Sequence, residues 1–107
     1  MRDLRIVFMG TPDFAVAGLQ KLVENKLNVV GVITAPDRPA GRGQKIQQSA
    51  VKKFALAHDL PVLQPTNLKA EAFLSELKAL NANLQIVVAF RMLPQQVWQM
   101  PEFGTFN

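Results

Sequence analysis

The chain has 107 residues, of which 49% are hydrophobic and 19% charged, and its formal net charge is +4. These values are typical of one globular domain and argue against a disordered chain. Cysteine is absent and there is one histidine, His58, which excludes a disulfide framework and a thiolate or histidine-rich metal cluster, so no metal is expected. The sequence shows neither the long apolar region of a signal peptide nor the roughly 20 apolar residues that cross a bilayer. We therefore expect a cytoplasmic protein with no membrane partner.

The predicted elements alternate between strands and helices from the start of the chain. Residues 4–9 are rich in strand formers and are followed by Gly10. Thr11 is expected to cap a helix, because Pro12 suits the first helical position and apolar residues then recur at helical spacing. Residues 29–34 are apolar almost throughout, as in a strand that is buried on both faces.

A long loop is predicted over residues 35–48. Pro36, Pro39, Gly41 and Gly43 interrupt any regular element there. Long loops in compact domains are commonly functional. This one carries three basic side chains, which are Arg38, Arg42 and Lys45. They fit either a solvated loop or a surface for phosphates, and both interpretations are open at this point.

The second half of the chain continues the alternation. Ser49 and Asn67 can each cap a helix, because apolar residues at helical spacing follow them. Trp98 and Met100 are expected to pack in the core. Three more strands are predicted, over residues 61–65, 86–89 and 103–107, and a short helix is predicted over residues 94–100. This order predicts an α/β fold with a parallel, Rossmann-like sheet and helices on both faces.

The turn after the first strand reads Gly10-Thr11-Pro12-Asp13-Phe14. In open α/β sheets ligands gather at the carboxyl ends of strands, where such turns lie. The turn is not the G-x-G-x-x-G fingerprint, because Pro12 and Phe14 replace the small residues that let a pyrophosphate approach. A dinucleotide site is therefore disfavoured. A well-capped helix start and an active-site loop are the two remaining interpretations.

Four segments together resemble the methionyl-tRNA formyltransferase family. They are the turn at 10–14, the basic loop at 36–43, Leu93-Pro94 after a buried strand, and Gly-Thr-Phe-Asn at 104–107. The resemblance implies transfer of a formyl group from 10-formyltetrahydrofolate to the α-amino group of methionine on initiator tRNA, for translation initiation. It also implies that Asn107 is catalytic and polarises the formyl oxygen, a kind of contribution typically worth about 10²–10³ in rate.

The same resemblance assigns the binding residues. The folate pocket would be lined by Phe90, Arg91, Met92 and Leu93, and the tRNA would be met by Arg38, Arg42 and Lys45. Residues 10–14 would form an active-site loop. One departure lies in the folate segment: the family commonly shows Ala-Tyr-Gly before a hydrophobic pair and a proline, whereas residues 89–94 are one residue shorter and include Arg91.

A second departure concerns the extent of the chain. The family continues after the Asn with His-x-Ser-Leu-Leu-Pro, a later catalytic Asp and a C-terminal β-barrel that binds tRNA. We therefore expect residues 1–107 to be the N-terminal part of the formyltransferase domain, cut at the start of its fifth strand and inactive alone. The resemblance implies that the parent protein is monomeric.

Two other functions are compatible with the sequence. Formyltransferases for a small amine, such as a sugar nucleotide or glycinamide ribonucleotide, share the sheet and the final Asn. A non-catalytic α/β module could instead use the basic loop to bind RNA.

Overall fold

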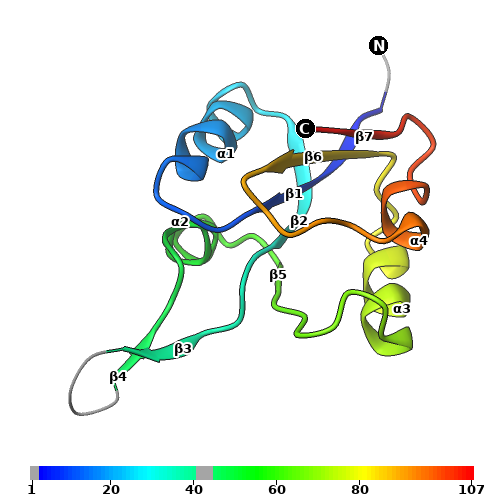
Figure 1. The fold of residues 1–107 in the computed structure, drawn as a ribbon. Helices are drawn as coiled ribbons and strands as arrows, with labels where there is room; N and C mark the ends of the chain where they lie inside the picture. Colours follow the sequence, from blue (N-terminus) through cyan, green and yellow to red (C-terminus); the bar gives the residue numbers. More distant parts are fainter. Residues whose placement is uncertain (1–2, 41–44) are drawn as a thin grey trace.

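A computed structural model describes residues 3–40 and 45–107, and Figure 1 shows their fold. Strands and helices alternate along most of the chain. Their order is β1 (Arg5–Gly10), α1 (Ala15–Glu24), β2 (Asn28–Ile33), β3 (Arg38–Ala40), β4 (Lys45–Gln47), α2 (Ala50–Ala57), β5 (Val62–Leu63), α3 (Glu71–Ala79), β6 (Leu84–Val88), α4 (Gln95–Trp98) and β7 (Thr105–Phe106).

Five of these strands form one parallel sheet in the order β5-β2-β1-β6-β7. The central strand, β1, pairs with β2 on one side and with β6 on the other. The chain therefore builds outward from β1 in one direction, returns to the centre, and then builds in the other direction. This reversal beside β1 is the topological switch point of a doubly wound sheet. The predicted α/β class with a parallel Rossmann-like sheet is confirmed.

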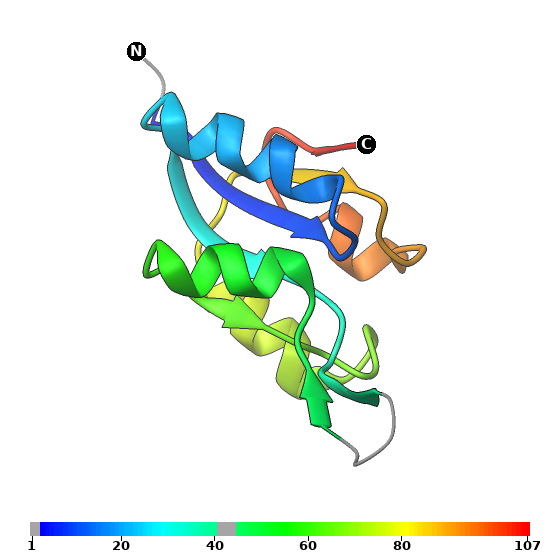
Figure 2. The same cartoon turned by 90° about the vertical axis from the view of Figure 1, so that its left-hand side faces the viewer.

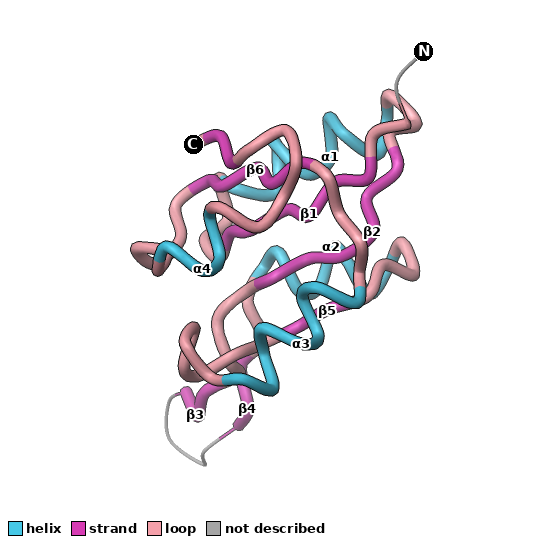
Figure 3. The backbone as a smooth tube through the Cα atoms, turned by 90° about the vertical axis from the view of Figure 1, so that its right-hand side faces the viewer, coloured by secondary structure: helices cyan, strands magenta, loops and turns pink. Residues whose placement is uncertain are grey.

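Helices cover both faces of the sheet. Figure 2 shows α1 and α2 on one face, and Figure 3 shows α3 and α4 on the other. The side chains of β1 alternate accordingly: Phe8 packs with the α1 and α2 side, whereas Val7 and Met9 pack with the α3 and α4 side. All three are fully buried. This period of two, with apolar residues on both faces, is the pattern of a central parallel strand.

Two of the three predicted helix caps are wrong. Helix α1 begins at Ala15 rather than after Thr11, whose hydroxyl instead accepts a hydrogen bond from the Ala35 backbone nitrogen at 3.3 Å. Asn67 uses its side chain on the Lys69 nitrogen, 2.9 Å away, and α3 begins only at Glu71. Ser49 does cap α2, since its Oγ accepts from the Lys52 nitrogen at 3.0 Å.

The segment predicted as a loop contains a β-hairpin. Strands β3 and β4 pair antiparallel, with Pro39 opposite Ile46, and the hairpin extends away from the main sheet at the lower left of Figure 1. A proline is tolerated because each strand of a two-stranded hairpin keeps one unpaired edge, where a missing N–H costs nothing. The prediction that residues 35–48 contain no regular element is therefore wrong for residues 38–40 and 45–47, which form strands. Arg42 lies outside the described residues.

No helix within residues 3–40 and 45–107 has the length and apolar character needed to cross a membrane. The longest of them, α1, has 10 residues.

Candidate functional site

The carboxyl ends of the parallel strands carry most of the predicted site residues. Gly10 ends β1 and lies against the end of β6, where a Cβ atom on Gly10 would be 2.8 Å from the Val88 carbonyl oxygen and 3.0 Å from the Ala15 Cβ. This close approach requires a residue without a side chain. It fixes the β1 turn directly beside the segment that follows β6.

A hollow of about 600 Å³ opens at the ends of β6 and β7, and we call it the β6–β7 hollow. Its volume falls in the range of roughly 300–1,000 Å³ that small-molecule sites occupy. It brings together the four predicted folate residues and Asn107. The lining residues are Val87, Ala89, Phe90, Arg91, Met92, Leu93, Trp98, Thr105 and Asn107.

Strand β7 positions Asn107 at this hollow. Thr105 pairs with Gln85 of β6, which is 1% exposed. The Thr105 hydroxyl lies 3.0 Å from Gln85 Oε1 and 2.8 Å from the Trp98 carbonyl oxygen, so it can donate to either. These contacts tie β7 to both β6 and α4. Asn107 follows the strand directly and is exposed at the rim.

The wall of the hollow turns sharply at Ala89, which has a φ of 51°. Few non-glycine residues adopt this left-handed conformation. Two residues later the Arg91 guanidinium donates to the carbonyl oxygens of Pro65 at 2.7 Å and of Thr66 at 3.1 Å. It also lies 5.0 Å from the centre of the Phe90 ring, within cation–π range. Arg91 thus ties the segment after β6 to the segment after β5.

A neighbouring hollow of about 580 Å³ lies on the other side of this wall. It is bounded by residues 66–69 and 91–94, so residues 91–93 line both hollows. Met92 is 94% exposed on the ridge that they share.

Trp98 is another lining residue, although the sequence predicted it in the core. It is 46% exposed and borders the β6–β7 hollow, while Met100 is partly buried against the α3 side as expected. Helix α4 has only four residues, and Val97 is the one that it buries fully. The shortness of the predicted helix, residues 94–100, was a signal that not every large side chain there could be buried.

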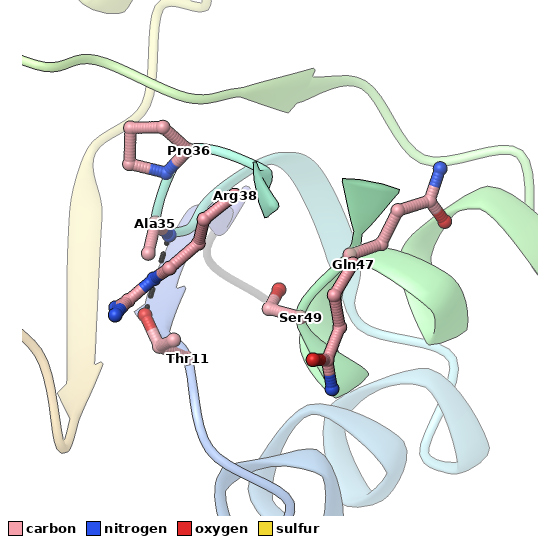
Figure 4. A pocket seen from close by; sticks show the side chains of 7 residues that line it. Thr11, Ala35, Pro36, Arg38, Gln47 and Ser49 are labelled. Carbon is pink, nitrogen blue, oxygen red and sulfur yellow. Dashed lines mark hydrogen bonds between the residues drawn. The ribbon is translucent and has the colours of Figure 1, made fainter. Parts of the chain in front are cut away.

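A smaller hollow of about 240 Å³ lies where the hairpin joins the sheet, and we call it the hairpin-root hollow. Figure 4 shows Arg38 and Thr11 on one side of it, with Gln47 and Ser49 on the other. Ala35, Pro36 and Gln48 complete its lining. Of the predicted tRNA-binding residues, Arg38 lies here. Lys45 starts β4, and nothing further is described of its side chain.

A polar framework supports the hairpin root. The Asp37 carboxylate accepts from Lys52 Nζ and from Gln64 Nε2, both at 2.7 Å, and Gln64 Nε2 also donates to the Ala35 carbonyl oxygen at 3.1 Å. The hydrogen bonds from Lys52 and then from Gln64 lower the pKa of Asp37 below its ordinary value. Local sequence does not predict the bonds of Lys52 and Gln64 to Asp37, because the three residues are 12 to 27 positions apart and no local pattern links them.

Of the 10–14 turn, Thr11 is the residue that lines one of the two hollows. Thr11 lines the hairpin-root hollow and hydrogen-bonds to Ala35. Asp13 and Phe14 are exposed, Phe14 by 69%. None of the five borders the β6–β7 hollow. The structure therefore groups Thr11 with Arg38 rather than with Asn107.

The charge around the hairpin-root hollow is positive. Among the residues that the structure describes (3–40 and 45–107), Arg38 is the one ionisable residue that lines this hollow, and it forms no ion pair. No group of three or more His, Cys, Asp or Glu side chains in the same described ranges is arranged to hold a metal ion.

Comparison with known proteins matches residues 4–107 to the family model described as formyl transferase. The chain belongs to the formyl transferase family. Methionyl-tRNA formyltransferase from Flavobacterium johnsoniae is 70% identical over 107 residues, which is all of this chain and 34% of that relative. The methionyl-tRNA formyltransferases of Bacteroides fragilis and Porphyromonas gingivalis are 68% and 57% identical over 105 residues. These residues make up 98% of this chain and 32% of each relative. This formyl transferase chain thus spans about a third of the length of the curated relatives that it matches.

Proposed function

We propose that the protein to which this chain belongs transfers a formyl group from 10-formyltetrahydrofolate to the α-amino group of methionyl-tRNA, for translation initiation. The supporting observation is the identity of 57–70%, across nearly the whole chain, with relatives that are named methionyl-tRNA formyltransferase. Because the chain covers about a third of those relatives, the activity is proposed for the whole protein. Residues 1–107 would form the N-terminal part of its catalytic domain.

The β6–β7 hollow suits the folate donor in size and lining. Phe90 and Trp98 offer aromatic surface for a flat ring, and Leu93 and Met92 add apolar contact. Small-molecule sites typically combine such a lining with a few polar groups that fix orientation. Here the polar groups are the side chains of Arg91, Thr105 and Asn107 and the backbone of residues 89–93. The donor would supply the formyl carbon, carried on a nitrogen atom.

Asn107 would act on the formyl oxygen. As the amine nitrogen bonds to the formyl carbon, negative charge develops on that oxygen, and the Asn107 amide N–H can donate a hydrogen bond to it. The bond between the formyl carbon and the donor nitrogen then breaks, and the proton lost by the attacking amine ends on that nitrogen. An amide does not accept protons at neutral pH, so we assign Asn107 charge stabilisation and not general-base catalysis.

The hairpin would face the RNA. Arg38, Arg42 and Lys45 supply cations for phosphate contacts, and Asp37, the acid nearest to them in sequence, is neutralised by Lys52 at 2.7 Å. This arrangement leaves the positive charge of the hairpin available to a polyanion. Phosphate contacts of this kind position a nucleic acid without reading its sequence.

The test uses the whole protein with 10-formyltetrahydrofolate and three acceptors: initiator methionyl-tRNA, glycinamide ribonucleotide and an amino-sugar nucleotide. We expect formyl transfer to methionyl-tRNA, with tRNA affinity that falls steeply as salt is raised. Transfer to a small amine instead would replace the proposed substrate. Salt-dependent RNA binding with no transfer to any acceptor would favour the non-catalytic binding module.

A further inference from the structure

Strand β7 has two residues, Thr105 and Phe106, and Asn107 follows it directly. Within the residues that the structure describes, β7 pairs with one strand, β6, at the edge of the sheet (Figure 1). The Gln85 nitrogen of β6 donates to the Gly104 carbonyl oxygen, just before β7, at 3.1 Å. Backbone donors and acceptors are alike at every residue, so a backbone bond of this kind does not by itself select one register.

The register of β7 decides on which face of the sheet Asn107 lies. Successive side chains of a strand point to opposite faces, so Thr105 and Asn107 share a face. Both border the β6–β7 hollow, whereas Phe106 does not. A slip by one residue would turn Asn107 away from the hollow and Phe106 toward it. The place of the proposed oxyanion donor thus depends on what holds β7.

Gln85 lies opposite Thr105 in the ladder and provides a contact that depends on register. It is 1% exposed. Burial of an amide is unfavourable unless the amide is hydrogen-bonded. The Thr105 hydroxyl lies 3.0 Å from Gln85 Oε1. Because these two side chains meet in one register alone, their bond selects it.

The same hydroxyl also contacts α4. Thr105 Oγ1 lies 2.8 Å from the carbonyl oxygen of Trp98, whose residue borders the β6–β7 hollow. A hydroxyl carries one proton and two lone pairs, so it donates to one of the two oxygens at a time. When it donates to Trp98, the Gln85 amide can turn its N–H₂ group toward Oγ1. One hydroxyl therefore fixes the strand before Asn107 relative to both β6 and the aromatic wall.

We propose that Thr105 is a positioning residue for formyl transfer and that the Gln85 amide holds it in place. The inference rests on the proposed function, in which Asn107 donates to the formyl oxygen. Thr105 acts through Asn107, because it keeps β7 in the register that puts Asn107 at the hollow. Its hydroxyl proton is engaged by protein oxygens and not by the donor. Misplacement of a reacting group by about 1 Å can cost about 10²-fold in rate.

The test compares Thr105→Val with Thr105→Ser in the whole protein. Val keeps the branched shape of Thr without its hydroxyl, whereas Ser keeps the hydroxyl. Thr105→Val should lower kcat for formylation of methionyl-tRNA by about 10–100-fold. The KM for 10-formyltetrahydrofolate should stay within about twofold, because the loss falls on the transition state and not on donor binding. Thr105→Ser should restore most of kcat.

A double-mutant cycle with Asn107→Ala tests whether Thr105 acts through Asn107. Once the Asn107 amide is removed, its position no longer matters, so Thr105→Val should lower kcat by less than about twofold further. Gln85→Met removes the buried amide and keeps a long unbranched side chain. It should lower kcat as well, and its loss should not add to that of Thr105→Val, since both break the same contact.

Thr34→Val is the matched control for loss of a hydroxyl. Thr34 is fully buried, and its Oγ1 lies 2.7 Å from Ser49 Oγ. Replacement by Val removes this bond, as Thr105→Val removes its own. The unfolding temperature should fall for both variants, but kcat at saturating methionyl-tRNA should fall for Thr105→Val alone. Thermal unfolding and kcat are measured on the same preparations.

The outcomes separate this inference from the proposed function. If the protein formylates methionyl-tRNA and Thr105→Val keeps the wild-type kcat, or raises KM for the donor in place of lowering kcat, the inference is overturned alone. Equal losses from Thr105→Val with and without Asn107→Ala would also overturn it, because Thr105 would then not act through Asn107. If Thr105→Val does not fold, Gln85→Met decides in the same two backgrounds. A wild-type protein that formylates no methionyl-tRNA would overturn the proposed function and the inference together.

Discussion

The two hollows at the carboxyl edge of the sheet differ in chemistry although they are neighbours. The β6–β7 hollow, of about 600 Å³, is walled mostly by aromatic and apolar side chains, including the exposed Met92, with Arg91, Thr105 and Asn107 as its polar residues. The hairpin-root hollow, of about 240 Å³, is lined mostly by residues with polar side chains. Strand β1, which ends at Gly10, lies between the strands that lead to them. A single sheet edge thus offers a surface for a flat apolar ring and a surface for an anion.

The supports of the two hollows differ as well. The hairpin root is held by side-chain hydrogen bonds from Lys52 of α2 and from Gln64, the residue after β5. The wall of the β6–β7 hollow is held by Arg91 on two backbone carbonyl oxygens and by the short pairing of β7 with β6. Under the proposed function, the donor and the acceptor would be bound by separately supported parts of one edge. Three substitutions, all in the whole protein, test this division.

The largest effect is expected at Asn107, in the β6–β7 hollow. Asn107→Ala removes the proposed hydrogen bond to the developing oxyanion, and kcat should fall by about 10²–10³. The measurement is single-turnover formylation of methionyl-tRNA. Affinity for deacylated tRNA should stay at the wild-type value, because the proposed phosphate contacts lie on the β3–β4 hairpin. A matched loss of tRNA affinity would contradict the division.

An intermediate effect is expected at Gly10, on the strand between the hollows. Gly10→Ala forces a Cβ against the Val88 carbonyl oxygen at 2.8 Å, and since this neighbour is backbone, it should destabilise the fold by about 1–3 kcal/mol. Gly18→Ala is the matched control, because its Cβ would meet Phe8 at an ordinary 3.5 Å within helix α1. That change should be neutral or stabilise by up to about 1 kcal/mol. Denaturant unfolding measures both, and equal stability of the two variants would contradict the close approach of β1 to β6.

The smallest effect is expected at Asp37, beneath the hairpin-root hollow. Its pKa is lowered in the folded protein from an ordinary value of 3.8, so its contacts stabilise the fold fully above about pH 4. This stabilisation is lost as the pH falls through the lowered pKa. Asp37→Asn should therefore unfold at a lower temperature than the wild type near pH 7, and the difference should shrink in strong acid. Asp13→Asn, at an exposed position, is the control that should follow the wild type throughout. A constant difference for Asp37→Asn at every pH would contradict the role of its charge.

Much of the fold could be predicted from local sequence. Residues 6–9 and 29–33 are continuous apolar runs, and the structure places both as neighbouring central strands. Ser49 caps the helix that follows it, because a cap needs only a polar side chain and the next three residues. Phe73 and Leu77 are buried on one face of α3, as their spacing indicates.

The incorrect predictions involve side chains whose partners lie far along the chain. Thr11 can cap a helix, but its hydroxyl is engaged by Ala35, 24 residues away. The pairing of Pro39 with Ile46 overrides the local preference against a strand. In the candidate site, the resemblance indicated residues 90–93 and Asn107, and the structure shows that they share one hollow. Neither Trp98 in that hollow nor the bonds of Lys52 and Gln64 to Asp37 could be predicted, because each depends on packing between distant segments.

The position of β1 at the centre of the sheet also has a consequence for folding during synthesis. β1 leaves the ribosome well before β6. The Arg5 nitrogen at the start of β1 donates to Asn83 Oδ1, which lies 78 positions later and just before β6. Ribosomes add about 5–20 residues per second, so one edge of β1 waits for several seconds without its permanent neighbour. Its apolar Val7 and Met9 are uncovered for the same interval. A chaperone that binds short apolar segments would meet this protein most readily in that window, and ribosome profiling of chaperone occupancy could detect it.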